Sequence, residues 1–529
     1  MTIRFSDQKN DNQCLADLQA SDPRDDKARI EADKGGLLRG SYRWVLSHVD
    51  FQRWQDDRDG QLFWIAGDPG KGKTMLLCGI IDELVKTTAP TANISFFFCQ
   101  AADARINNAT AVLRGLIYML VTQQPALISH LRKNYDGFGK QRFEGPNAWV
   151  ALSKIFTSIL DDARLPKTYL IIDALDECTG DPGLLLDLVA RKASKYPSVK
   201  WLVSSRNWPS IEKGLDTATR KVRLSLELNE ESVSAAVTTY VQFKVEGLAE
   251  RNKYSNDTRD TVKRNLSANA HRTFLWVALV CKQLADISDW EAEEMSTTFP
   301  PGLDTLYRRM MDQICNDRRA KLLKSILVVI SVVYRPITLD EVAALVDVPA
   351  RASGNHEALA EIVGLCGSFL TLRERTVSFV HQSATDFLLG EARDEIFPTG
   401  VEDIHHHIFS RSLRVMSNTL RRDIYSLGAP GFPIDQVKPP DPDPLATARY
   451  SYIYWVNHLR NCDPKKNANN NIRDGGSIDA FLRQNYLHWL KALGLLKGMS
   501  ERTASILELE RLFEVSFYQC NLGTTLTFR

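Results

Sequence analysis

Short apolar runs alternate with longer amphipathic stretches between Leu62 and Leu226. The apolar runs predict five buried strands, at Leu62–Ala66, Ile94–Cys99, Tyr169–Asp173, Trp201–Ser204 and Val222–Leu226. Apolar residues at helical spacing predict helices between them, at Ala109–Val121, Ala148–Leu160 and Leu184–Ala193. Because strands alternate with segments of helix length, this region predicts a parallel sheet that is covered by helices on both faces.

Helical spacing replaces the strand pattern after Glu227. Four helices are predicted next, at Glu230–Gly247, Asp260–Ala270, Leu275–Ala285 and Leu303–Cys315. Three more, at Lys321–Tyr334, Leu339–Val346 and Glu357–Leu365, precede a predicted hairpin of Phe369–Arg373 and Thr376–His381. Three helices followed by a hairpin are typical of a winged helix. A last group of helices is predicted around a proline-rich break at 430–444, at Ile404–Met416, Tyr450–Leu459, Ala480–Leu495 and Ser505–Leu512.

The composition is that of an ordinary globular protein large enough for several domains. The 529 residues carry 66 basic and 65 acidic side chains, so the charge balance argues against a dedicated nucleic-acid binder. Nine cysteines without paired spacing argue against a disulfide framework or a zinc site. No apolar run approaches the ~20 residues that a membrane span needs, and the first residues lack a signal-peptide core. We therefore expect a cytoplasmic protein in a reducing compartment.

The segment after the first predicted strand matches the phosphate-binding pattern GxxxxGK[ST]. In such a loop the glycines let backbone N–H groups converge on a phosphate, at the positive end of the following helix. Lys73 is expected to contact the β- and γ-phosphates, and the Thr74 hydroxyl is expected to bind Mg²⁺. The predicted nucleotide-binding residues are Gly67, Asp68, Pro69, Gly70, Lys71, Gly72, Lys73, Thr74 and Met75.

Acidic side chains follow another predicted strand, at Asp173, Asp176 and Glu177. An acid at the carboxyl end of a buried strand lies in the crevice where ligands bind, so Asp173 is a predicted Mg²⁺ ligand. Glu177 or Asp176 is expected to orient and deprotonate the attacking water. Arg206 ends the next strand and is expected to sense the γ-phosphate, with a solvated strand-end arginine as the alternative.

These motifs resemble those of the fungal NACHT proteins, a branch of the STAND class of signalling NTPases. The resemblance covers about residues 15–500 and lies in Ser21–Lys27, Lys34–Leu38, Phe63–Leu76, Leu170–Cys178, Val203–Pro209 and Phe379–Leu388. It implies an α/β fold, with a P-loop NTPase parallel sheet followed by a helical domain, a winged-helix domain and a C-terminal helical segment. The expected boundaries are a polar, helical lead-in at 1–45 with a helix entry at Ser21–Asp26, the NACHT core at 46–226, the helical domain at 227–316, the winged helix at 317–395 and the last helical segment at 396–529.

The resemblance also implies a function. Such proteins switch between a closed form that holds ADP and an open form that holds ATP, with slow hydrolysis as the reset. His381 lies in the winged-helix histidine motif and is expected to contact the β-phosphate of ADP. The nucleotide is expected to be ATP or ADP with Mg²⁺. GTP stays open, because Phe274 stands where many relatives carry a base-contacting proline.

The expected role is signalling in fungal innate immunity or heterokaryon incompatibility. Neither an effector domain of usual size before the core nor a repeat array after it is visible in the sequence. We therefore expect either self-association and partner proteins that supply these parts, or a truncated remnant. A nucleotide-binding scaffold without enzymatic activity is a further alternative.

Two other features are set aside. The predicted recognition helices of the winged helix carry Asp340, Glu341, Glu357 and Glu361, so DNA binding is not expected. The run His405–His407 is interpreted as a solvated helix start, because consecutive helical positions point in different directions and form no metal site.

Overall fold

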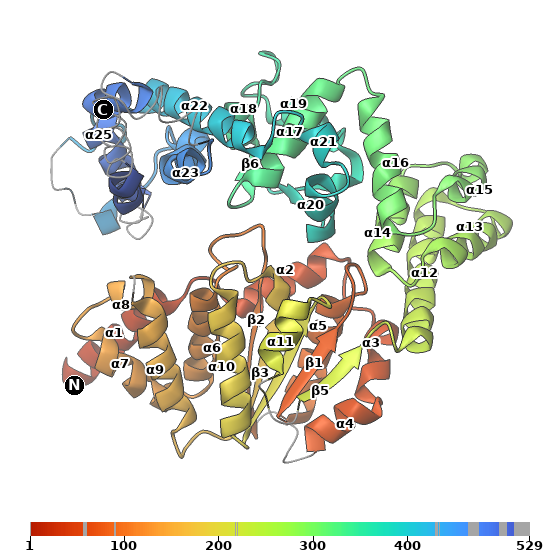
Figure 1. Cartoon of the computed structure of the whole chain (residues 1–529), viewed down its shortest axis with the longest axis horizontal. Coiled ribbons are helices and arrows are strands. Elements are labelled where there is room, and N and C mark those ends of the chain that lie inside the picture. Colours follow the sequence, from red (N-terminus) through yellow and green to blue (C-terminus); the bar gives the residue numbers. More distant parts are fainter. Residues whose placement is uncertain are drawn as a thin grey trace, which may run out of the picture. The chain divides into compact units, whose positions relative to one another are not determined.

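Five parallel strands form the central sheet of the first part of the chain, in the order β2-β3-β4-β1-β5 (Figure 1). Their bounds are β1 Leu62–Ala66, β2 Ala92–Phe98, β3 Lys167–Asp173, β4 Val199–Ser205 and β5 Lys221–Ser225. In the register of β1 with its two neighbours, Ala66 lies opposite Ser205 and Ser225. All five strands therefore end at the same edge of the sheet, as the sequence predicts.

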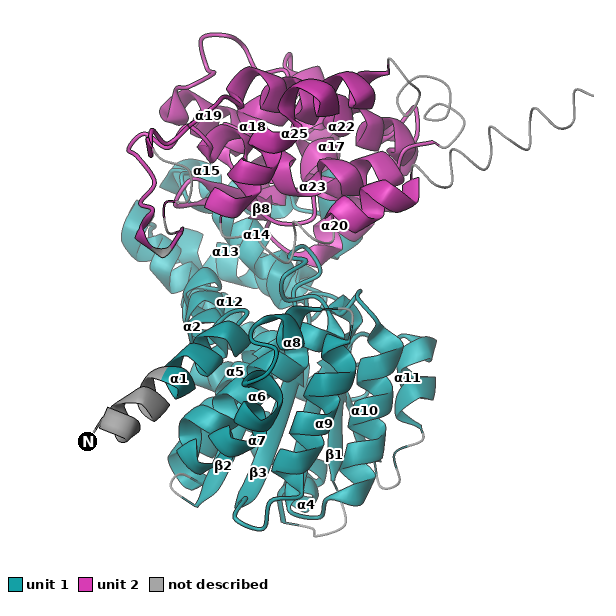
Figure 2. Cartoon of the chain, turned by 90° about the vertical axis from the view of Figure 1, so that its left-hand side faces the viewer, with its two compact units in different colours: residues 1–309 teal, residues 310–529 magenta. Residues whose placement is uncertain are grey.

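The structure is a computed structural model, and it describes residues 2–512 except 57–60, 89–90, 146, 217, 219–220, 429–431, 433, 464–475 and 497–504. The chain divides into two compact units, Met1–Arg309 and Met310–Arg529 (Figure 2). The finer division into five segments stays a prediction.

Alternating side chains of the strands are buried on the two faces of the sheet. One face places Trp64, Leu170 and Trp201 in a core with helices α6, α9, α10 and α11. On the other face, Phe63 contacts aromatic side chains of α4, with ring centroids 5.6 Å apart for both Phe51 and Trp54. The helices are α4 Val49–Asp56, α5 Lys73–Thr88, α6 Ala109–Gln123, α9 Ala148–Leu160, α10 Pro182–Lys195 and α11 Pro209–Leu215. This two-sided cover confirms the predicted fold class.

Several helices of the first unit were not predicted from the hydrophobic pattern. They are α1 Thr2–Leu18, α3 Arg39–Leu46, α7 Ile128–Tyr135, α8 Gln141–Glu144 and α15 Asp289–Thr298. Helix α2 Pro23–Asp33 begins at the helix entry that Ser21–Asp26 predicts in the lead-in. The predicted helices of the helical domain are present, as α12 Glu230–Asn252, α13 Asn256–Asn269, α14 Phe274–Leu284 and α16 Leu303–Cys315. The missed helices are short or strongly polar, so their apolar stripes are weak.

The second unit contains the predicted winged helix. Three helices, α17 Ala320–Val332, α18 Leu339–Leu345 and α19 His356–Gly364, precede the hairpin of β7 Leu370–Arg373 and β8 Thr376–Phe379. The short strand β6 Ile337–Thr338 pairs with β8, which gives a three-stranded antiparallel sheet. Glu374 and Arg375 both take positive φ angles at the hairpin turn, of 44° and 73°. The later described helices are α20 Gln382–Leu389, α21 Arg393–Ile396, α22 Val401–Thr419, α23 Arg449–Arg460, α25 Ser477–Leu495 and a helix at 505–512.

The interpretation of His405 as a solvated residue is wrong. His405 lies on α22 with only 9% of its surface exposed, and its Nδ1 is 2.8 Å from Nδ1 of His458 on α23. His458 in turn contacts the Tyr450 hydroxyl through Nε2, at 2.6 Å. The sequence could not show this, because the partner histidine is supplied by another helix that packs against α22.

Candidate functional site

The P-loop joins the end of β1 to the start of α5 and is closely covered by another part of the first unit. Gly70 and Gly72 have positive φ angles of 75° and 81°, which glycine adopts without strain. A Cβ at Gly72 would lie 2.8 Å from the ring of Phe274, at the start of α14. A Cβ at Gly70 would lie 2.7 Å from the Thr273 side chain. Both glycines are therefore required by the turn and by the close approach of the helical domain.

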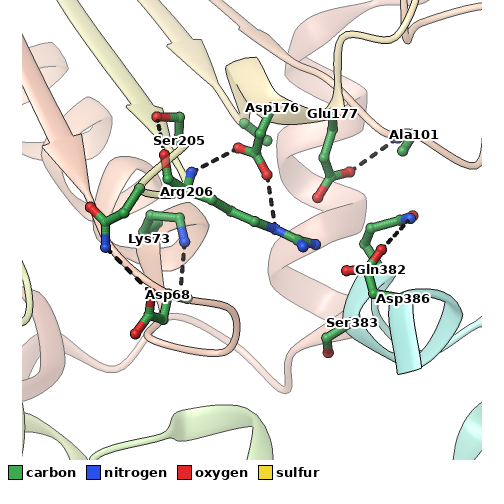
Figure 3. Close-up of polar contacts among 12 residues, drawn as sticks. Asp68, Lys73, Ala101, Asp176, Glu177, Ser205, Arg206, Gln382, Ser383 and Asp386 are labelled. Carbon is green, nitrogen blue, oxygen red and sulfur yellow. Dashed lines mark hydrogen bonds and ion pairs between the residues drawn. The ribbon is translucent and has the colours of Figure 1, made fainter. Parts of the chain in front are cut away.

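Lys73 is the first residue of α5 and points back into the loop. Its ammonium donates to the backbone carbonyls of Gly67, at 2.5 Å, and Asp68, at 3.0 Å (Figure 3). Burial lowers the pKa of Lys73, although the nearby carboxylates of Asp173 and Asp176 oppose that shift. The loop thus holds a buried cation within reach of any group that its backbone N–H donors bind.

Asp173 is buried at the end of β3, beside the start of α5. Its carboxylate accepts a hydrogen bond from the Ser204 hydroxyl at 2.5 Å, and the Thr74 hydroxyl also bonds to it. Burial raises the pKa of Asp173. A hydroxyl and a carboxylate are the hard oxygen donors that Mg²⁺ prefers, so Thr74 and Asp173 fit this ion. Within the described ranges no group of three or more His, Cys, Asp or Glu side chains is arranged to hold a metal by itself.

The two neighbouring acids Asp176 and Glu177 have different surroundings (Figure 3). Asp176 accepts from the backbone N–H of Arg206 at 3.0 Å and forms an ion pair with its Nε, also at 3.0 Å. Glu177 accepts a hydrogen bond from the backbone N–H of Ala101, at 3.0 Å. Burial, with a smaller contribution from the Asp176 charge, raises the pKa of Glu177 to about 7. Asp176 is therefore held in an ion pair with Arg206, while Glu177 can gain or lose a proton near neutral pH.

Glu227, for which the sequence predicts no role, holds the beginning of the P-loop. Its carboxylate accepts from the backbone N–H of Asp68 at 2.7 Å, from the Asn207 amide at 3.0 Å and from the Ser225 hydroxyl at 3.1 Å. The pKa of Glu227 is lowered by these hydrogen bonds, led by that from Asp68, against the opposing effect of burial. The sequence pattern that could have predicted this role is an acid just beyond the end of a strand, β5, at the same edge of the sheet as Asp173.

A cavity of about 200 Å³ lies beside the loop. It is lined by Asp68, Lys71, Leu226, Glu227, Glu230, Val233 and Arg272. The Lys71 ammonium donates to the His271 carbonyl at 3.2 Å, next to this cavity. Acidic and basic side chains are mixed on its wall, so the cavity itself selects no single charge.

His381 lies in the second unit, at the N-cap of α20. Its Nδ1 accepts from the backbone N–H of Ser383 at 3.1 Å. Because a backbone N–H can only donate, the proton of the neutral ring is on Nε2, which makes that atom a donor. The nucleotide contact predicted for His381 joins the two units and stays a prediction.

Comparisons with known proteins agree with these features. Residues 40–206 match the family described as Nephrocystin 3, N-terminal, and residues 308–399 match the winged helix domain of GPI inositol-deacylase. Vegetative incompatibility protein HET-E-1 of Podospora anserina is 56% identical over 518 residues, which is 95% of this chain. The chain is a homologue of HET-E-1. This similarity confirms the resemblance to the NACHT-type STAND NTPases, and the chain spans 38% of the length of that relative.

Solved structures show only a distant likeness. The match with the Walker-type ATPase of Pyrococcus abyssi covers 64% of this chain and 93% of the ATPase chain, with 12% sequence identity and a TM-score of 0.32. The match with the ORC1 protein of Aeropyrum pernix, solved in complex with DNA, covers 66% of this chain and 96% of the ORC1 chain. The sequence identity is 13% and the TM-score is 0.28. Among the described helices, none is long and apolar enough to cross a membrane.

Proposed function

We propose that the chain is the nucleotide-binding switch of a NACHT-type signalling protein. The observation that carries the proposal is the meeting of Lys73, Thr74, Asp173 and Glu177 at the carboxyl edge of the sheet. Backbone N–H groups and Lys73 would hold the phosphates, and Thr74 and Asp173 would hold Mg²⁺. When bound, this ion supplies charge stabilisation to the phosphates.

The proposed switch would hydrolyse its bound nucleotide slowly. Glu177 is the proposed base, because a carboxylate with a pKa of about 7 accepts a proton from water more readily than an ordinary glutamate does. Asp176 is favoured less, since its two oxygens already hold Arg206. Arg206 would then be the group that contacts the γ-phosphate. The ion pair with Asp176 would hold the Arg206 guanidinium in place before the nucleotide binds.

The switch itself would depend on His381. A donor at Nε2 suits the β-phosphate of ADP, and one hydrogen bond to a charged phosphate contributes about 1.5–3 kcal/mol. A contact that exists in only one arrangement of the two units supplies the differential affinity that a switch needs. HET-E-1 is a vegetative incompatibility protein, so heterokaryon incompatibility is the proposed setting, with self-association or partner proteins as the proposed output.

The test is nucleotide binding by Lys73→Ala. The full chain is purified, its bound nucleotide is identified after denaturation, and ATP, GTP and ADP affinities are measured by calorimetry with Mg²⁺. Removal of the Lys73 ammonium should weaken ATP binding at least tenfold, because a charge-assisted contact contributes about 1.5–3 kcal/mol. Lys86→Ala, at the far and exposed end of α5, is the matched control and should bind as the parent does. Equal affinity of parent and Lys73→Ala would contradict the proposal.

A further inference from the structure

Lys34 is held at a defined position by the end of helix α2. The backbone N–H of Gly36 donates to the Glu31 carbonyl at 2.8 Å, and that of Gly35 donates to Ala32 at 3.1 Å. These two bonds form a Schellman motif, in which Lys34 is the last residue before the chain turns away. Gly35 has the positive φ angle of 82° that this motif requires. The side chain of Lys34 therefore starts from a fixed point and not from a loose linker.

Helix α2 lies against α5, the helix that begins at the P-loop (Figure 1). Lys27 forms ion pairs with Asp82 on α5, at 2.7 Å, and with Glu31 one turn further along α2, at 2.5 Å.

Near the start of α2, Arg24 donates to the Tyr118 hydroxyl at 3.4 Å, nine residues into α6, which also begins at the carboxyl edge of the sheet. Just after the end of α2, Gly35 lies beside the Lys244 ammonium of α12, a helix that leads away from that edge. Helix α2 therefore runs towards the carboxyl edge, opposite to α5, which begins there.

The antiparallel arrangement puts the end of α2 beside the beginning of α5. Lys34 lies seven residues after Lys27, which is about 10 Å of helix at 1.5 Å per residue. The same length measured back from Asp82 leads to Met75, next to Lys73 and Thr74. Lys34 is thereby level with the phosphate-binding end of α5.

Lys34 is half-buried, and among the described residues its ammonium makes no hydrogen bond or ion pair. Burial lowers the pKa of Lys34, and the carboxylate of Glu177 is the charge that opposes this shift. The ammonium therefore lies within electrostatic range of Glu177, the acid proposed to act on water at the terminal phosphate. A partly desolvated cation without a partner is costly unless an anion joins it.

We propose that Lys34 is a second cation of the nucleotide site, which contacts the γ-phosphate and makes the site favour triphosphate over diphosphate. This inference rests on the proposed function and extends it, because it gives the segment before the core a direct contact with the nucleotide. The ammonium would lie on the Glu177 side of the site, opposite the loop carbonyls that Lys73 contacts. An ADP-bound site lacks the group that Lys34 would contact, so α2 would sense which nucleotide is present.

The experiment compares Lys34→Met, which keeps the length of the side chain and removes its charge, with the parent chain. Affinities are measured by calorimetry for ADP and for the non-hydrolysable triphosphate AMP-PNP, both with Mg²⁺. We expect AMP-PNP affinity to fall at least tenfold and ADP affinity to change less than twofold. Lys34→Arg keeps a cation and should restore most of the preference for triphosphate. Arg29→Met removes one charge from α2 at an exposed position and should change neither affinity.

Two results would overturn the assignment of Lys34. One is an equal loss of AMP-PNP and ADP affinity in Lys34→Met, which would mean a general structural effect. The other is a folded Lys34→Met chain whose preference for AMP-PNP over ADP equals that of the parent. This result counts when the parent binds both nucleotides and the Lys73→Ala variant binds neither. That second result would leave the proposed function in place. A parent chain that binds no nucleotide would overturn both the function and the role of Lys34.

Discussion

The pH dependence of nucleotide hydrolysis tests the assignment of Glu177. Its carboxyl has a pKa of about 7, where an ordinary glutamate has about 4.5, because it is buried near Asp176 and Asp173. Only the ionised form can accept a proton. About one tenth of the groups are ionised at pH 6 and about nine tenths at pH 8, so kcat should rise roughly tenfold over that range.

Two variants separate the neighbouring acids. Glu177→Gln keeps the size of the side chain and removes the base, so turnover should fall about 100-fold or more while ATP still binds. Asp176→Asn removes a negative charge that raises the pKa of Glu177, so the midpoint of the profile should move to lower pH. This variant also breaks the ion pair with Arg206, and its effect on the rate itself is measured separately from the midpoint.

The assay is phosphate release from saturating ATP and Mg²⁺ between pH 5.5 and 8.5, in buffers of constant ionic strength. Circular dichroism at each pH confirms that the chain stays folded. A flat profile for the parent would refute the reasoning, because it would mean that no group with a pKa near 7 controls the step. Loss of turnover in Asp176→Asn, with normal turnover in Glu177→Gln, would identify Asp176 as the base.

Two further outcomes concern the second unit. His381→Leu removes the Nε2 donor and should speed the release of a fluorescent ADP analogue and increase the hydrodynamic radius; an unchanged off-rate in a folded variant would make His381 a structural residue. Burial lowers the pKa of both His405 and His458, so the folded unit binds fewer protons than the unfolded chain below about pH 6.5. The free energy of unfolding should therefore fall with decreasing pH by about 1.4 kcal/mol per unit for each histidine that stays neutral. Urea unfolding at pH 5.5 and 7.5 measures this slope, which should decrease in His458→Asn and persist in His356→Asn.

Much of the fold follows from patterns that are local in the sequence. The five strands, the P-loop from Gly67 to Thr74 and the helices around the winged helix lie within a few residues of their predicted positions. Burial of a strand on both faces requires a continuous apolar run, and a phosphate loop requires glycines at fixed spacing. Such requirements act on neighbouring residues, so they are readable without the structure.

The roles of individual side chains at the site depend on contacts between distant segments. Asp176 and Glu177 are equivalent in the sequence, and only the position of Arg206 and the backbone of Ala101 makes them different. The hold of Glu227 on Asp68 joins residues that are 159 positions apart. From the sequence, Glu227 is an acid that follows a predicted strand, and nothing near it in the chain indicates its bond to Asp68.

Lys34 and His405 show the same limit. The local pattern predicts a solvated helix start for His405 and assigns no role to the Lys34 side chain. The packing of α2 against α5 places Lys34 near Glu177, and the packing of α22 against α23 buries His405 beside His458. The sequence by itself determined the architecture and the phosphate loop. The tertiary structure decided which charges are buried and paired, because desolvation and ion pairing depend on distances that chain neighbours do not set.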